Sequence, residues 1–309
     1  MTDYKNRMLL FLKGMGMGGA DVVPGVSGGT IAFITGIYEE LLDSIKSFDL
    51  EALKLLKEFR LADFWQKING NFLLVLFAGI GVSVLTISEL IGTLLKDHPI
   101  QLWSFFFGLI IISAILVART IKSWNYRVVL FLIAGTILAY FVTSFSPAKT
   151  STSYPFIFLS GAVAICAMIL PGISGSFILL ILGKYEFIIN AVTERKLGII
   201  IVFAAGCAIG LLSFARLLSW ALKRWHDIMV AFLSGFMIGS LNKIWPWKRT
   251  LETYVDRHDE VKPLVQENVS PQAFESTIGD PHLTEAILFS LGAVVVVFLI
   301  DLIARRQSK

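Results

Sequence analysis

The sequence has few charged residues, few histidines and only two cysteines. Aspartate, glutamate, lysine and arginine make up 16% of its 309 residues, whereas soluble domains average about 25%. Cys166 and Cys207 lie in separate apolar runs without the spacing of a zinc site, and the four histidines are scattered through polar segments. The composition therefore argues against a soluble domain, a disulfide framework and a resident metal. A net charge of +4 gives no reason to expect a nucleic-acid partner.

Apolar residues are abundant instead, at 55% of the chain with a mean hydropathy of +0.73. Several apolar runs are close to about 20 residues, the length that a helix needs to cross a bilayer. They predict an all-α polytopic membrane protein. The runs are Phe72–Leu95, Ile100–Ala118, Val128–Phe145, Leu197–Leu222, Ile228–Trp245 and Glu285–Ala304.

Two further apolar regions, Met8–Leu42 and Tyr154–Ile189, are each interrupted near the middle by Pro-Gly-x-Ser-Gly. Each arm has roughly 16 residues, or about 24 Å of helix, which is shorter than the roughly 30 Å hydrocarbon core of a bilayer. Paired short segments broken by glycine and proline are typical of helices that enter and leave a membrane on the same side. We therefore expect re-entrant helical hairpins at residues 8–42 and 154–189.

The basic residues set the expected orientation, because lysine and arginine concentrate in cytoplasmic loops. If both hairpins are re-entrant, the basic N-terminus, the basic C-terminal tail and the segments 43–71, 119–127 and 223–224 all lie inside. That map places roughly twice as many basic residues in the cytoplasm as outside. Treating both hairpins as full spans moves the 119–127 and 223–224 loops outside. The re-entrant map is preferred, and it puts both termini in the cytoplasm.

The polar segments complete the expected organisation. Residues 43–71 include "LEALKLLKEFRLADFWQKI", which predicts an amphipathic interfacial helix. Residues 247–283 are polar and contain several prolines, which predicts a small extracytoplasmic loop or helical cap. The expected parts are a first repeat (1–126), a linking span (127–153), a second repeat (154–246), the polar loop (247–283) and a C-terminal span with a basic tail (284–309).

An internal repeat appears when the motif copies "ADVVPGVSGGTIAFITGIYEELL" and "AMILPGISGSFILLILGKYEFII" are aligned. A second block then aligns, with Glu89 opposite Arg216. Each half holds a hairpin and two spans, and the single span between them reverses the second half, which predicts the inverted-topology repeat of many secondary transporters. The aligned pairs include Pro24/Pro171, Gly25/Gly172, Ser27/Ser174, Gly28/Gly175, Gly36/Gly183, Tyr38/Tyr185, Glu39/Glu186, Gly79/Gly206 and Gly108/Gly235.

Each motif has residues that end one helix and begin the next. Pro24 and Pro171 favour the end of the preceding helix, and Ser27 and Ser174 are favourable N-caps for the following one. Because free N–H groups and the dipole at a helix start attract anions, we expect the two helix starts to meet near the membrane midplane and bind an anionic group. The alternative is that small residues only let helices pack closely. The predicted binding residues are Ser27, Gly28, Gly29, Thr30, Ser174, Gly175 and Ser176.

Charged residues inside the apolar regions are functional candidates, because they are costly in a membrane unless paired or hydrated. Arg216 lies in the middle of a span, and its guanidinium group suits a phosphate or carboxylate, so it is the predicted counter-charge. An ion pair between Arg216 and Glu89 is the alternative, and Lys184 is expected to extend to the surface. Glu39 and Glu186 could instead be interfacial anchors beside tyrosines. The candidates for a coupling or charge network are Glu39, Glu89, Glu186 and Asp21.

The two motif copies resemble the PopT-like polyprenyl-phosphate translocase family of bacterial and archaeal membranes, formerly a domain of unknown function. The resemblance covers nearly the whole chain, and only the motifs are carried over from it. It implies that the protein flips undecaprenyl phosphate, the lipid carrier for wall polymers, from the outer to the cytoplasmic leaflet. The second copy has Ser176 for Gly29 and Phe177 for Thr30, so the two half-sites could differ in hydrogen bonding.

A lipid-phosphate translocase is therefore the predicted function, with polyprenyl phosphate and the bilayer as partners. A small-anion channel or exchanger could use the same helix ends and is the alternative. A membrane phosphatase or transferase would need a nucleophile, a base and usually a metal cluster, which the sequence does not present, so neither enzyme activity nor a cofactor is expected. A structural scaffold leaves the buried charges unexplained. Coupling to protons or ions and assembly as a homodimer stay open.

Overall fold

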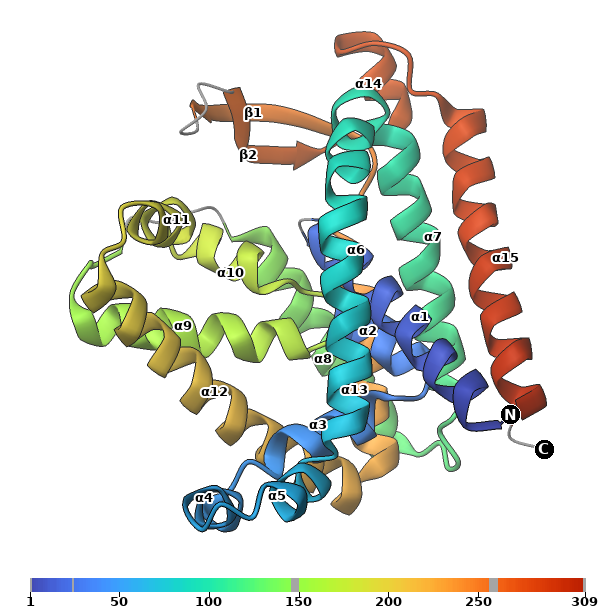
Figure 1. The fold of residues 1–309 in the computed structure, drawn as a ribbon. Coiled ribbons are helices and arrows are strands. Elements are labelled where there is room, and N and C mark those ends of the chain that lie inside the picture. Colours follow the sequence, from blue (N-terminus) through green and yellow to red (C-terminus); the bar gives the residue numbers. More distant parts are fainter. Residues whose placement is uncertain (1, 24, 146–149, 256–260, 308–309) are drawn as a thin grey trace.

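The computed structural model describes residues 2–23, 25–145, 150–255 and 261–307. Pro24, which was expected to end the first helix, lies outside the described residues, as do the last two residues of the expected basic tail. The described chain is mostly helical, with fifteen helices and one two-stranded sheet (Figure 1). The elements are α1 (Thr2–Val22), α2 (Gly28–Ile34), α3 (Tyr38–Lys46), α4 (Leu50–Lys57), α5 (Leu61–Lys67), α6 (Gly70–Asp97), α7 (Pro99–Ala118), α8 (Tyr126–Ser144), α9 (Tyr154–Ile169), α10 (Gly175–Ile181), α11 (Tyr185–Thr193), α12 (Leu197–Arg224), α13 (His226–Ser240), β1 (Lys248–Val255), β2 (Val261–Asn268), α14 (Pro271–Thr277) and α15 (Leu283–Gln307).

Four helices of the described chain, α6, α7, α8 and α12, are long and apolar enough to cross a membrane, and the bent pair α10 and α11 would add a fifth. These four coincide with expected spans. The other two expected spans correspond to α13 and α15, although α13 ends at Ser240, before the expected end at Trp245. This architecture agrees with the predicted all-α polytopic membrane protein.

The first arm of each hairpin packs along a 28-residue helix, α1 along α6 and α9 along α12. A Cβ at Gly79 would overlap the carbonyl oxygen of Phe11, and a Cβ at Gly206 would overlap that of Phe158. Gly79 and Gly206 are aligned in the repeat, so both halves use the same backbone contact. Small residues at helix crossings permit this approach, and close packing holds helices together where lipid surrounds them.

The remaining long helices form two more pairs that join distant parts of the chain. α7 packs against α15 where Gly108 faces the backbone of Ser290, and α13 packs against α8 where Gly235 faces the backbone of Leu132. Gly108 and Gly235 are also aligned in the repeat. The linking helix α8 therefore packs on the second half of the chain, and the C-terminal helix α15 packs on the first half (Figure 1).

α2 folds back against α1, and α10 folds back against α9, which forms two helical hairpins. The chain reverses at Gly25 and Gly172, whose φ angles of 90° and 101° favour glycine. A single helix was expected for the returning arm of each hairpin. The structure instead breaks each arm again, at Gly36 and Gly183. In the second hairpin this break bends α10 from α11 by 108°.

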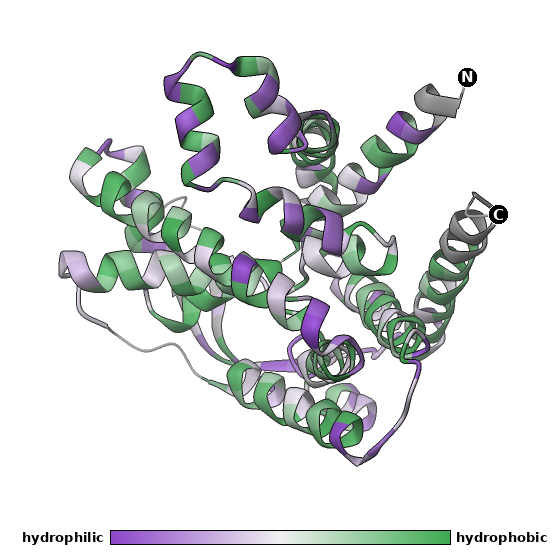
Figure 2. Ribbon diagram, turned by 90° about the horizontal axis from the view of Figure 1, so that it is seen from below, coloured by the Kyte–Doolittle hydropathy of each residue, from purple (hydrophilic) through white to green (hydrophobic). Residues whose placement is uncertain are grey.

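The prediction of a single amphipathic helix over residues 43–71 is wrong, because this segment holds the end of α3 followed by α4 and α5. The side chain of Asp49 caps α4 by accepting a hydrogen bond from the N–H of Ala52 at 2.9 Å. Phe59, with a φ angle of 57°, ends α4 and separates it from α5. Figure 2, seen from the end of the molecule that carries α4 and α5, shows many hydrophilic residues on these short helices, whereas the long helices are largely hydrophobic.

Residues 247–283 form a β-hairpin followed by α14, where a loop or helical cap was expected. β1 pairs antiparallel with β2, from Lys248 opposite Asn268 to Val255 opposite Val261. An isolated two-stranded ribbon is marginally stable. Here Trp245, just before β1, donates to the Val269 carbonyl just after β2 at 2.8 Å, and its ring lies 5.5 Å from that of Phe107 on α7. The ribbon lies at the end of the molecule opposite α4 and α5 (Figure 1).

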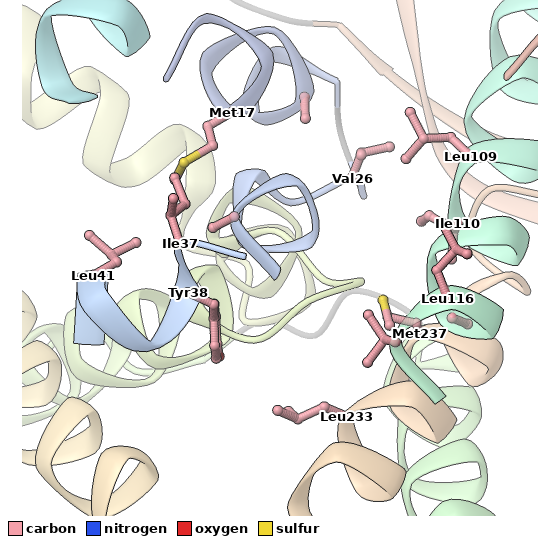
Figure 3. Packing of buried hydrophobic residues seen from close by; sticks show 14 of the residues in the cluster. Met17, Val26, Ile37, Tyr38, Leu41, Leu109, Ile110, Leu116, Leu233 and Met237 are labelled. Carbon is pink, nitrogen blue, oxygen red and sulfur yellow. The ribbon is translucent and has the colours of Figure 1, made fainter. Parts of the chain in front are cut away.

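The main hydrophobic core lies between the first hairpin, α7 and α13. Figure 3 shows Val26 and Tyr38 of the first hairpin facing the same interior as Ile110 of α7 and Met237 of α13. All four side chains are buried. Because Val26 directly precedes Ser27 and packed interiors tolerate little displacement, this core fixes the position of the first motif.

Candidate functional site

The structure brings the two Pro-Gly-x-Ser-Gly motifs into direct contact. The Gly25 N–H donates to the Ser174 hydroxyl at 3.1 Å, and the Gly172 N–H donates to the Thr30 hydroxyl at 3.0 Å. The two bonds are reciprocal, because each motif supplies one backbone donor and one hydroxyl acceptor. We call this contact, formed by residues 25–30 and 172–176, the motif crossing.

Three of the four hydroxyl-bearing residues at the motif crossing are buried, and Ser176 is partly exposed. Ser27 and Thr30 are 0% exposed, and Ser174 is 4% exposed. The Ser27 hydroxyl donates to the Met168 carbonyl oxygen at 3.0 Å, at the end of α9. The crossing is therefore closed in this conformation, and its three buried hydroxyls bond to the opposite half of the chain.

Ser27 and Ser174 also cap the helices that follow them, as predicted. Ser27 accepts a hydrogen bond from the N–H of Gly29 at 3.1 Å, and Ser174 accepts one from the N–H of Phe177 at 3.3 Å. The Ser174 hydroxyl lies 3.2 Å from that of Ser176. The same hydroxyl of Ser174 thus caps α10 and accepts the bond from the opposite motif, so separating the motifs also affects the start of this helix.

A carboxylate already occupies the start of α2. Asp21 accepts a hydrogen bond from the N–H of Gly28 at 2.7 Å, and a negative charge is favourable at this end of a helix. The residue aligned with Asp21 in the second copy is Met168, so α10 has no equivalent carboxylate. The two halves of the crossing therefore differ in charge as well as at the aligned pair Gly29 and Ser176.

The glycines of the motifs are in close contact with the opposite or adjacent backbone. A Cβ at Gly29 would press on the carbonyl oxygen of Ile169, and a Cβ at Gly175 would lie 2.7 Å from that of Ala164. At Gly28 the added atom would lie 2.6 Å from the Asp21 carboxylate. The close packing that was the alternative interpretation of the motifs is thus present in the structure.

Arg216 contacts the turn between α3 and α4 rather than the motif crossing. Its side chain is exposed on α12, and Nη2 donates to the carbonyl oxygen of Phe48 at 3.1 Å. Glu89 is exposed on α6, and the two side chains form no ion pair with each other in the part of the chain that the structure describes. The helix α12 packs against α9 and α3, which directs Arg216 away from α6.

The other predicted charged residues are distributed over the molecule. Glu39 lies at the end of the first hairpin, where Oε1 is 3.6 Å from Nε2 of His226. Glu186 is exposed on α11. Asp21 alone among these described carboxylates contacts the motif crossing.

A polar cluster that sequence reasoning missed joins the end of the first hairpin to α12. Asp43 accepts hydrogen bonds from the Ser219 hydroxyl and the Lys223 ammonium group, each at 2.7 Å, and it pairs with Lys46 at 2.7 Å. Ser219 and Lys223 are four residues apart and so share one helix face. The spacing was visible in the sequence, but the partner Asp43 could be found only from the packing of α3 on α12.

Lys184 is buried, so the expectation that it extends to the surface is wrong. It is 1% exposed, and Nζ donates to the Thr150 carbonyl oxygen at 2.7 Å. The same atom lies 5.6 Å from the ring centroids of Phe156 and Phe187. Aromatic faces attract a cation, so the carbonyl and the two rings replace water around this ammonium group and hold the turn between α10 and α11.

A cavity of about 320 Å³ lies between α8, α10 and the β-hairpin. Lys243, Lys248 and the α10 residue Phe177 line it. Nζ of Lys243 lies 4.5 Å from the ring centroid of Phe177, and Nζ of Lys248 lies 4.4 Å from that of Trp103. Burial lowers the pKa of Lys248 well below its ordinary value, and the charge of Lys243 lowers it further. Sequence reasoning passed over both lysines, although "NKIWPWK" places them around two tryptophans at the end of an apolar run.

Known proteins resemble this chain over most of its length. The family model described as undecaprenyl phosphate translocase-like matches residues 17–262. A protein named polyprenyl-phosphate transporter from Vibrio cholerae is 48% identical over 302 residues, which cover 97% of this chain and 98% of the relative. A protein of the same name from Staphylococcus aureus is 31% identical over 257 residues, 76% of this chain and 85% of the relative. No solved structure matches. The chain, with its two crossed motifs and apolar helices, belongs to the undecaprenyl phosphate translocase-like family.

Proposed function

We propose that this protein moves polyprenyl phosphate across the bacterial or archaeal cytoplasmic membrane, from the outer to the cytoplasmic leaflet. Such transport would return undecaprenyl phosphate for reuse in cell-wall polymer synthesis. The names of the two relatives and of the family support the substrate. The distribution of basic residues supports an orientation with both termini and the helices α4 and α5 on the cytoplasmic side.

The observation that carries this proposal is the pair of reciprocal hydrogen bonds at the motif crossing. Gly25 and Gly172 donate their N–H groups to Ser174 and Thr30, and all four groups lie between the two halves of the chain. Separation of the motifs would free two backbone donors and two hydroxyls at once. Phosphate is well suited to such donors, because its oxygens accept hydrogen bonds from backbone N–H groups and hydroxyls. The crossing thus acts as a gate that opens onto the headgroup.

The movement that opens the gate is a displacement of one inverted repeat against the other. Matched glycine contacts in the two halves support the repeat, with Gly79 and Gly206 facing the first arms of the hairpins. In this arrangement the first hairpin enters the membrane from the cytoplasmic side and the second from outside, so their tips meet near the midplane. Alternating access in inverted-repeat transporters is largely such a rocking movement.

The predicted charged residues take different roles in this mechanism. Arg216, beside the α3–α4 turn on the cytoplasmic side, attracts the headgroup as it leaves the gate. Asp21 competes with phosphate for the N–H of Gly28, so its protonation would couple the gate to a proton. Glu39, Glu89 and Glu186 stay candidates for the remaining charge network.

Reconstitution into vesicles tests the proposal directly. Vesicles carrying labelled undecaprenyl phosphate in one leaflet should lose that asymmetry when the purified protein is present, and protein-free vesicles should keep it. The measurement is the fraction of label accessible from outside over time. Folded protein that leaves the asymmetry intact would contradict the proposal. Rapid flux of a small anion through vesicles without the lipid would instead favour the channel or exchanger that uses the same helix ends.

A further inference from the structure

Two lysines beside the motif crossing have no carboxylate partner among the residues that the structure describes. Lys243 and Lys248 line the cavity between α8, α10 and the β-hairpin, and Lys248 donates to the Lys243 carbonyl oxygen. The acidic residue in the cavity wall, Glu267, is already paired with Arg249 at 2.7 Å. Two neighbouring cations that are partly withdrawn from water are unfavourable without a counter-charge. The cavity therefore has the electrostatic character of an anion site.

We propose that this cavity is the extracytoplasmic binding site for the phosphate headgroup of a polyprenyl phosphate, with Lys243 and Lys248 as its ligands. This assignment rests on the proposed function and adds substrate contacts that lie outside both motifs. A phosphate monoester carries about two negative charges near neutral pH, so its binding would supply the counter-charge that favours the protonated form of both lysines.

A polar wall holds the cavity in shape around the lysines. Asn242 donates to the hydroxyls of Thr143 and Ser144 at 3.3 and 3.2 Å. Asn268 of β2 donates in turn to the side-chain oxygen of Asn242 at 2.9 Å. This chain of hydrogen bonds joins α8, the end of α13 and the β-hairpin. It gives the β-hairpin a role, because β1 carries Lys248 and β2 closes the wall.

Other residues that line the cavity are aromatic or aliphatic and suit a lipid tail. Tyr140 and Phe145 at the end of α8 are 52% and 62% exposed, and Leu180 and Ile181 line the cavity from α10. A ligand that leaves its isoprenoid chain in the bilayer can place its headgroup against the lysines and its first isoprene units along this rim. A free phosphate ion gains nothing from the rim, so the geometry favours the lipid.

The cavity borders the motif crossing through two residues that line it, Lys243 and Phe177. Cγ of Lys243 would lie 3.0 Å from a Cβ built at Gly25, and the Lys243 ammonium group lies over the ring of Phe177, whose N–H donates to Ser174. A headgroup bound by Lys243 is therefore adjacent to both motifs, on the side of the β-hairpin. The site would hold the phosphate before the gate opens.

Binding of undecaprenyl phosphate to the purified protein tests the assignment. Lys243→Met and Lys248→Met keep the apolar stem of each side chain and remove the charge. We expect each to weaken binding about tenfold and the pair about a hundredfold, as the loss of charge-assisted hydrogen bonds predicts. Lys243→Arg should retain most of the affinity. Lys196→Met is the matched control, because Lys196 is exposed, paired with Glu194 at 2.6 Å and placed on the same side by the charge map.

Three outcomes distinguish a wrong binding site from a wrong proposed function and from a wrong ligand. Wild-type protein that binds and transports the lipid, together with methionine variants that bind it equally well and unfold at the same temperature, would overturn the site and leave the proposed function standing. Wild-type protein that neither binds nor transports the lipid would overturn both. Inorganic phosphate should compete only in large excess over the lipid, and competition at equal concentration would reassign the site to a free anion.

Discussion

Transport of polyprenyl phosphate should fall to background when Thr30 is replaced by valine and Ser174 by alanine in one protein. Each substitution removes the acceptor of a reciprocal bond and leaves a buried glycine N–H unsatisfied. An unsatisfied buried group costs about 1–3 kcal/mol, so the closed crossing loses about 2–6 kcal/mol in total. The measurements are the rate of leaflet exchange in vesicles and the thermal unfolding of the purified protein.

The matched control replaces hydroxyls that take no part in the crossing. Thr86 and Ser213 are exposed, and each donates to a carbonyl oxygen of its own helix, at 2.7 and 2.6 Å. Thr86→Val combined with Ser213→Ala should therefore leave both rate and unfolding temperature close to those of the wild type. Thr30→Ser, which keeps the acceptor, should retain transport. If the double variant Thr30→Val and Ser174→Ala transports the lipid at the wild-type rate, the gate does not depend on these bonds.

Gly79→Leu should prevent the protein from folding in the membrane. A Cβ at this position would overlap the backbone carbonyl of Phe11, and the whole of α1 would have to move away from α6. Overpacking typically costs about 1–3 kcal/mol and occasionally more, and a clash with backbone belongs at or above the upper end of that range. The yield of monodisperse protein after extraction in detergent measures the effect.

Gly81→Leu provides the control on the same helix, because nothing lies within 4 Å of a Cβ at Gly81. The Gly81→Leu variant should give the same yield of monodisperse protein as the wild type and unfold at the same temperature. Gly206→Leu tests the equivalent contact in the second half and should fail like Gly79→Leu, since its Cβ would overlap the carbonyl of Phe158. Normal folding of either clashing variant would contradict the close helix pairs and the alignment of the two halves.

The hairpins and long helices were predictable from sequence because their signals are local. Apolar runs fix the approximate extents of α6, α7, α8 and α12, and the serine caps of α2 and α10 appear as residue types at fixed positions in the motif. The second break of each returning arm was less visible. Gly36 and Gly183 were recognised as aligned glycines, but only the backbone reveals their positive φ angles and the bend that follows.

The partners of the polar groups were not predictable, because they depend on contacts between distant segments. The alignment matched Ser27 with Ser174, yet the bonds of the crossing join Gly25 to Ser174 and Gly172 to Thr30. The alignment also placed Glu89 opposite Arg216, whereas equivalent positions in two repeats need not be neighbours in space. Arg216 instead contacts the Phe48 carbonyl.

The polar ends of the molecule were the least predictable part. Hydrophobic patterning, which identifies spans, carries little information about the β-hairpin or the division of residues 43–71 into short helices. Lys243 and Lys248 were overlooked for the same reason, since a lysine at the end of an apolar run is usually an interfacial residue. The position of Lys243 against Gly25 and Phe177, and of Lys248 against Trp103, became clear only with the fold.

The central claim is that the headgroup passes through the motif crossing, and photo-crosslinking tests it most directly. A polyprenyl phosphate analogue with a photoreactive group next to the phosphate would be incubated with the reconstituted wild-type protein, irradiated and mapped by mass spectrometry. We predict labelling of the segments 25–30 and 172–177, with loss of the label when excess undecaprenyl phosphate is added. Label confined to the lipid-facing surfaces of α6 and α12, and unaffected by the competitor, would contradict the account.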